Sequence, residues 1–87
     1  MMLLLSIVAC APPDACERMC APAQSRYEAC MAERGLAWGD AYADAADYQD
    51  WCQTWAWEAR ELGEAERCEA MESAFTDGDC EAYDNAW

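Results

Sequence analysis

The chain has 87 residues and a formal net charge of -13, and it contains neither histidine nor lysine. This length allows one domain, and the charge disfavours nucleic acids and anionic lipid headgroups as partners while it favours basic proteins or hard cations. Because imidazole and amine side chains are missing, the usual general base and the usual Schiff-base amine are excluded, and we expect no enzymatic activity and no cofactor.

An apolar segment without charged side chains, residues 1–9, precedes the first cysteine, Cys10. A segment this short cannot cross about 30 Å of hydrocarbon as a helix, but it suits the apolar part of a signal peptide. The tetrapeptide Ile7-Val8-Ala9-Cys10 resembles a bacterial lipobox. The alternatives are an ordinary secretory signal and a short N-terminal helix.

The lipobox resemblance implies that residues 1–9 are removed and that Cys10 carries a lipid. Residues 10–13 would then be a lipidated linker, and residues 14–87 the cysteine-rich domain. By the same resemblance, Ala11 after the cysteine implies the outer membrane, with the periplasmic or surface orientation left open. Two or more acyl chains suffice for a stable anchor.

The first predicted helix covers residues 14–34. Asp14 and Glu17 form a capping-box pattern, Pro22 interrupts the run, and Gly35 is a typical C-terminal glycine. Pro22 is expected either to kink this helix or to begin a second segment at its first position. Steps of three and four residues place on one face Cys16, Cys20, Ala23, Tyr27 and Cys30.

Two further helices are predicted at 40–62 and 64–75, separated by Gly63. The tail after Thr76 is expected to be irregular, or to form one short turn, and to be pinned by Cys80. The apolar stripe of the second helix consists of Ala41, Ala45, Tyr48, Cys52, Trp55, Ala59 and Leu62. Short connections make neighbouring helices antiparallel. The sequence therefore predicts an all-α domain, a small three-helix bundle.

Disulfides are the expected source of stability, because beyond the leader the only aliphatic residues larger than alanine, apart from methionine, are Leu36 and Leu62. Such a core supplies at most about 3–5 kcal/mol in a small domain. Seven cysteines are an odd number, and lipidation of Cys10 leaves six for three bridges. Thiolate metal or redox chemistry is the other interpretation, but no Cys-x2-Cys or Cys/His pattern of zinc sites occurs.

The helical rise selects one pairing among these six cysteines. On a straight helix Cys20 and Cys30 are about 15 Å apart, whereas a disulfide needs Cα atoms within about 7 Å. Folding the chain back near residue 36 and again at Gly63 brings one cysteine of each later segment level with one of the first helix. These folds predict the disulfides Cys16–Cys68 and Cys20–Cys52, and they suggest Cys30–Cys80, which also depends on the course of the irregular stretch after residue 76.

Two surface features are candidate sites. At 100° per residue, Trp57 points away from the apolar stripe of its helix, so it is a candidate anchor for a partner. The weak candidates for a Ca²⁺ site are the four acidic residues Asp77, Asp79, Glu81 and Asp84, although they do not match the EF-hand pattern. The alternative for Trp57 is that the bundle or the tail covers its side chain. The alternative for the four acidic residues is that they form ordinary solvated surface.

From these features we expect a non-catalytic, lipid-anchored cell-envelope protein whose acidic, disulfide-rich module binds another protein or has a structural role. An envelope protein that binds or buffers Ca²⁺ is the first alternative. A small secreted inhibitor or effector is the second, if Cys10 is not acylated.

Overall fold

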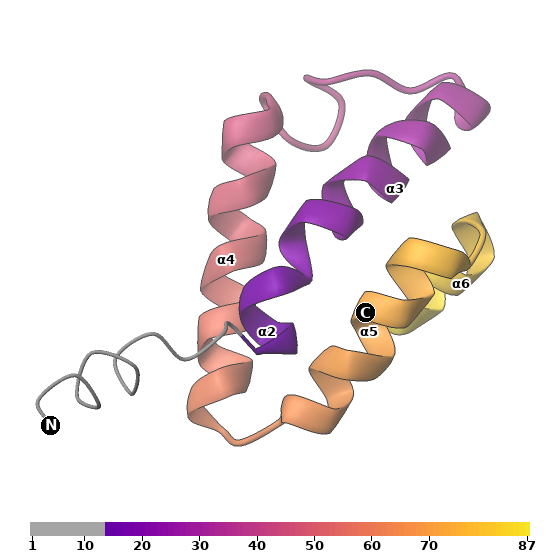
Figure 1. The fold of residues 1–87 in the computed structure, drawn as a ribbon. Helices are drawn as coiled ribbons and strands as arrows, with labels where there is room; N and C mark the ends of the chain where they lie inside the picture. The colour runs from indigo at the N-terminus through magenta and orange to yellow at the C-terminus, as the bar shows by residue number, and fades with distance from the viewer. Residues whose placement is uncertain (1–13) are drawn as a thin grey trace, which may run out of the picture.

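A computed structural model describes residues 14–87, and this part of the chain is helical without any strand (Figure 1). Its elements are α2 (Ala15–Arg18), α3 (Cys20–Arg34), α4 (Ala45–Glu61), α5 (Ala65–Asp77) and α6 (Cys80–Ala86). The all-α class is confirmed for these residues, but the prediction of three helices is wrong. The predicted signal peptide 1–9 and linker 10–13 lie outside the described residues.

The first predicted helix is divided at Met19 into α2 and α3. Asp14 caps α2 by accepting a hydrogen bond from the Glu17 backbone N–H at 3.0 Å. Met19 retains right-handed helical angles (φ -69°, ψ -24°), so α2 leads almost directly into α3. Pro22 is the third residue of α3, where a missing N–H costs little because the first four N–H groups of a helix have no intrahelical partner.

The helix α4 begins five residues later than predicted, because the two aspartates before it cap different turns. Asp44 accepts a hydrogen bond from the Asp47 backbone N–H at 2.8 Å and begins the helix. Asp40 instead accepts one from the Ala37 backbone N–H at 2.7 Å within the loop. As predicted, α4 stops before Gly63, which has a positive φ of 75°.

The tail that we predicted to be irregular contains the helix α6. Asp79 caps this helix by accepting a hydrogen bond from the Ala82 backbone N–H at 2.9 Å. Between α5 and α6, a Cβ atom on Gly78 would lie 2.5 Å from the Ala74 carbonyl oxygen and 2.6 Å from the Ala82 Cβ. Glycine therefore allows α6 to fold back closely against α5.

Three disulfides join these helices: Cys16–Cys68 between α2 and α5, Cys20–Cys52 between α3 and α4, and Cys30–Cys80 between α3 and α6. Their Cα–Cα distances are 4.9, 5.9 and 5.7 Å. They are the pairs that the helical rise predicts. The helix α3 contacts α4, α5 and α6, so these cross-links tie the other helices to the α2–α3 segment.

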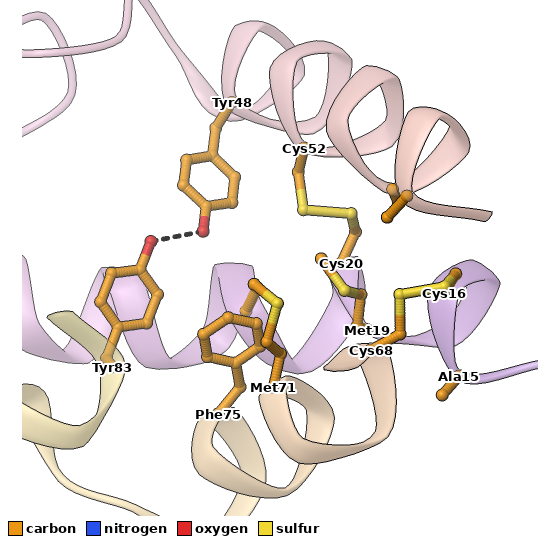
Figure 2. Close-up of a cluster of buried hydrophobic side chains, with 13 residues drawn as sticks. Ala15, Cys16, Met19, Cys20, Tyr48, Cys52, Cys68, Met71, Phe75 and Tyr83 are labelled. Atoms are coloured by element: carbon orange, nitrogen blue, oxygen red, sulfur yellow. Dashed lines mark hydrogen bonds between the residues drawn. A yellow bond between two sulfur atoms is a disulfide. The ribbon is translucent and has the colours of Figure 1, made fainter. Parts of the chain in front are cut away.

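Sulfur and aromatic rings make up most of the core (Figure 2). Among the described residues no leucine is buried, since Leu36 is 48% exposed and Leu62 is 73% exposed. Leu62 does not continue the inward stripe of α4 as predicted, because it follows the last helical residue and its backbone is no longer helical. The largest fully buried side chains are Tyr48, Phe75, Met19, Met71, Cys16, Cys20, Cys52 and Cys68.

Candidate functional site

Trp57 is the most exposed of the five tryptophans, with 62% of its surface open to solvent. It projects from α4 on the side away from Trp55, as the periodicity of the helix predicts. Trp55 is half-buried, packs edge-on against Trp87 with ring centroids 5.3 Å apart, and lies beneath the Arg67 guanidinium at 5.1 Å. The outward orientation predicted for Trp57 thus agrees with the structure. That Trp57 binds a partner protein is a proposal.

A groove of about 360 Å³ adjoins Trp57 on the side where α2 packs against α4. Its floor contains two buried residues, Cys16 and Ala56, which are 1% and 3% exposed. We call this groove the Trp57 surface, and its lining residues are Cys16, Glu17, Gln53, Thr54, Ala56, Trp57 and Arg60. Nothing in the sequence alone indicated the groove, because it requires α2 and α4 to lie side by side.

Arg60 holds the rim of the Trp57 surface together. Its guanidinium donates a hydrogen bond to Glu17 Oε1 at 2.7 Å, and its Nε lies 3.5 Å from Asp14 Oδ2. These side chains are about half-exposed, so each ion pair contributes roughly 0–1 kcal/mol. Their main effect is positional, since they fix the start of α2 beside the last turn of α4.

A second cluster consists of aromatic rings around a buried tyrosine pair, Tyr48 and Tyr83, which Figure 2 shows near Phe75. The hydroxyl groups of Tyr48 and Tyr83 share a hydrogen bond of 2.6 Å. Burial raises the pKa of both phenols above the ordinary value of 10.0, and for Tyr48 the bond to Tyr83 raises the pKa further. Both hydroxyls are therefore protonated at neutral pH, and their arrangement is structural.

The tyrosine pair was not predicted from the sequence, because Tyr83 lies in the tail that was expected to be irregular. Tyr27 stacks on Tyr48 with ring centroids 4.8 Å apart, and Phe75 lies 5.2 Å from the ring of Tyr83. The signal that could have revealed Tyr83 was Asp79, a good N-cap residue directly before Cys80.

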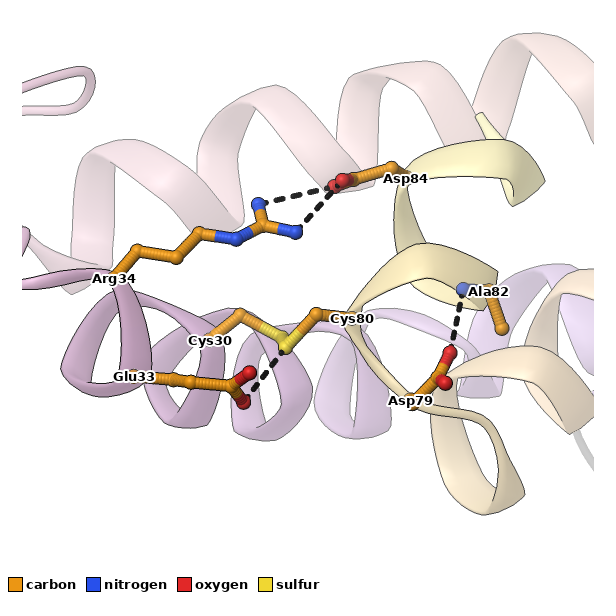
Figure 3. A network of polar contacts seen from close by, with 7 residues as sticks. All are labelled: Cys30, Glu33, Arg34, Asp79, Cys80, Ala82 and Asp84. Carbon is orange, nitrogen blue, oxygen red and sulfur yellow. Dashed lines mark hydrogen bonds and ion pairs between the residues drawn. A yellow bond between two sulfur atoms is a disulfide. The ribbon is translucent and has the colours of Figure 1, made fainter.

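The third disulfide, Cys30–Cys80, lies within a small polar network (Figure 3). Arg34 donates to Asp84 Oδ2 at 2.8 Å and to Asp84 Oδ1 at 3.4 Å, which ties the end of α3 to α6. The Glu33 carboxylate lies 3.4 Å from the Cys80 sulfur. That sulfur is bonded to Cys30 and has no hydrogen to donate, so the contact is one of packing only.

The four acidic residues considered for Ca²⁺ have other roles where their contacts are defined. Asp79 caps α6 and Asp84 binds Arg34, while Asp77 is the last residue of α5. Within residues 14–87, no three side chains of the histidine, cysteine, aspartate or glutamate type converge in a way that could hold a metal ion. The structure does not bring Asp77, Asp79, Glu81 and Asp84 together as a ligand set.

The predicted lipidation residue, Cys10, lies outside the described residues. Over residues 14–87, none of the helices is long and apolar enough to cross a membrane. No protein-family model, curated protein or solved structure matches the chain.

Proposed function

We propose that the chain is a non-catalytic, lipid-anchored protein of the bacterial cell envelope, and that its acidic, disulfide-rich helical domain serves as an interaction or structural module. The observation that carries this proposal is the state of the seven cysteines. Six are joined in pairs, and the remaining one, Cys10, stands at the cysteine position of the lipobox-like sequence.

The six paired cysteines support an oxidising compartment. Five of them are at most 2% exposed, so the disulfides are part of the packed interior. Stable disulfides of this kind are typical of exported proteins and rare in the reducing cytosol. In an exported chain, a seventh cysteine would remain as a free reactive thiol or pair with another molecule. Acylation of Cys10 after export would remove that thiol.

A module without catalysis fits the side chains that are present. The chain has no histidine or lysine, and its best-buried polar pair, Tyr48 and Tyr83, keeps its protons at neutral pH. The Trp57 surface is the face with the clearest capacity for contact, because it combines an exposed indole with a groove.

The intact mass of the protein recovered from membranes of a bacterial host tests the proposal. We expect loss of residues 1–9, added acyl groups on Cys10, and six missing hydrogens from three disulfides. A Cys10→Ser variant should stay unprocessed and lose its acyl mass. The matched control, Cys30→Ser with Cys80→Ser, should lose one disulfide and retain acylation.

A mature chain with an unmodified thiol at Cys10, or a chain that retains residues 1–9 in the host membranes, would contradict the lipid anchor. The first of these results would favour a small secreted inhibitor or effector instead.

A further inference from the structure

The described chain begins beside the C-terminal end of α4. Asp14, the first described residue, lies 3.5 Å from Arg60 in the last turn of that helix, and Glu17 accepts a hydrogen bond from the same guanidinium. Figure 1 shows α2 next to the lower part of α4. An anchor attached to the chain before residue 14 would therefore hold this end of the domain. We call it the α2 end; it comprises α2 and the C-terminal part of α4.

Among the described residues, the two most exposed large apolar side chains lie at the α2 end. Leu62 is 73% exposed and Trp57 is 62% exposed, against 48% for Leu36 and 37% for Trp51. Leu62 follows the last residue of α4, and Trp57 precedes it by five positions. At 1.5 Å per residue these positions differ by about 7.5 Å along the helix axis.

Charge is distributed unevenly between the two ends. Three of the five arginines, Arg18, Arg60 and Arg67, lie towards the α2 end and partly offset its carboxylates. These carboxylates are Asp14, Glu17, Glu58, Glu61, Glu64, Glu66, Glu69 and Glu72. The opposite end contains the loop before α4 and the turn between α5 and α6. Together with the end of α3, its acidic residues are Glu33, Asp40, Asp44, Asp47, Asp50, Asp77, Asp79, Glu81 and Asp84, and Arg34 is paired with Asp84 there.

We propose that the α2 end rests on the surface of a phospholipid bilayer, with Leu62 and Trp57 in the lipid interface. This inference depends on the proposed acylation of Cys10. From Cys10 to Asp14 the chain spans four Cα steps, at most about 14 Å when fully extended. An acylated Cys10 must therefore keep the α2 end close to the headgroups.

The two apolar side chains match the depth of that layer. With α4 along the bilayer normal, the axial distance between Leu62 and Trp57 is a difference in depth, and it is close to the thickness of the polar region of one leaflet, about 5–8 Å. Leu62 can thus reach the boundary of the acyl chains while Trp57 lies among the headgroups, where tryptophan is enriched in membrane proteins. A zwitterionic lipid suits the contact, because the net charge of -13 opposes an anionic surface.

Tryptophan quenching by brominated lipid tests this orientation. The mature protein, recovered from membranes and checked by mass for acylation, is reconstituted in phosphatidylcholine vesicles whose acyl chains carry bromine near the glycerol. We compare the parent with Trp57→Phe and with Trp51→Phe. Trp51 is the matched control, because it is an exposed tryptophan on the same helix, about 9 Å further from the α2 end.

We expect bromine to quench the parent and Trp51→Phe equally, and most of that quenching to disappear in Trp57→Phe. Equal quenching of all three acylated proteins would overturn the inference and leave the lipid anchor intact. The Trp57 surface would then be open to a protein partner. A protein without acyl mass would overturn both the anchor and this inference.

Discussion

Replacing Cys16 and Cys68 with alanine removes the disulfide that joins α2 to α5, whose two cysteines are 52 positions apart. In the chain-entropy description, closing a loop of this length stabilises the folded state by about 4 kcal/mol, because it restricts the unfolded chain. At roughly 0.05–0.15 kcal/mol per residue, a domain of the size of residues 14–87 is stable by about 4–11 kcal/mol. The double substitution should therefore remove at least about a third of the free energy of unfolding.

Urea unfolding followed by tryptophan fluorescence measures this loss. With a slope of about 1–2 kcal/mol per M, the midpoint should fall by about 2–4 M, or the variant should already be unfolded without urea. Replacing Cys30 and Cys80 with alanine is the comparison, because its loop has nearly the same sequence separation of 50. A midpoint shift below about 0.5 M for Cys16 and Cys68 would refute the idea that cross-links compensate for the thin core.

Three further outcomes follow from the described contacts. Tyr83→Phe should lower the free energy of unfolding by about 1–3 kcal/mol in urea titrations, because it leaves the buried Tyr48 hydroxyl without its partner, and Tyr42→Phe is the control. Because the folded-state pKa of both buried phenols lies above the ordinary 10.0, stability should be constant below about pH 9 and fall as the pH rises past 10; an unchanged urea midpoint up to pH 11 would contradict this. Asp79→Ala removes the hydrogen bond to the Ala82 N–H and should cost about 1 kcal/mol, seen as faster amide exchange in α6 than in α3.

The features predicted well from the sequence are those that depend on the regular geometry of helices. The rise per residue placed Cys16 level with Cys68 and Cys20 level with Cys52, and 100° per residue placed Trp57 outside. The glycines at 35 and 63 ended helices, and both have positive φ. In each case, a local rule about one helix decides the result.

The start of α4 and the missed helix α6 were predicted wrongly because a polar side chain had more than one available role. Asp40 and Asp44 are both good N-cap residues, and only the hydrogen bond from Ala37 shows that Asp40 belongs to the loop. Likewise, the run Thr76-Asp77-Gly78-Asp79 is typical of a turn, which concealed the fact that Asp79 also begins a helix. Local sequence leaves this choice open, because it depends on which backbone N–H groups the fold brings near each carboxylate.

The groove beside Trp57 was beyond prediction for a different reason. Its floor contains Cys16 from α2 and Ala56 from α4, and its rim depends on the contact between Arg60 and Glu17. Single-helix periodicity describes which side of one helix is apolar. It does not give the packing of two helices at the level of individual side chains.

A core in which cystines replace the customary aliphatic side chains also governs when the domain can form. Before their thiols are oxidised, residues 14–87 have alanines, a few methionines and aromatic rings to bury, and neither of their two leucines lies in the native interior. If the protein is exported as proposed, synthesis in a reducing cytosol would leave it in the extended state that a translocation channel requires. The disulfides would then form only after export, so the domain would fold only once the chain had crossed the membrane.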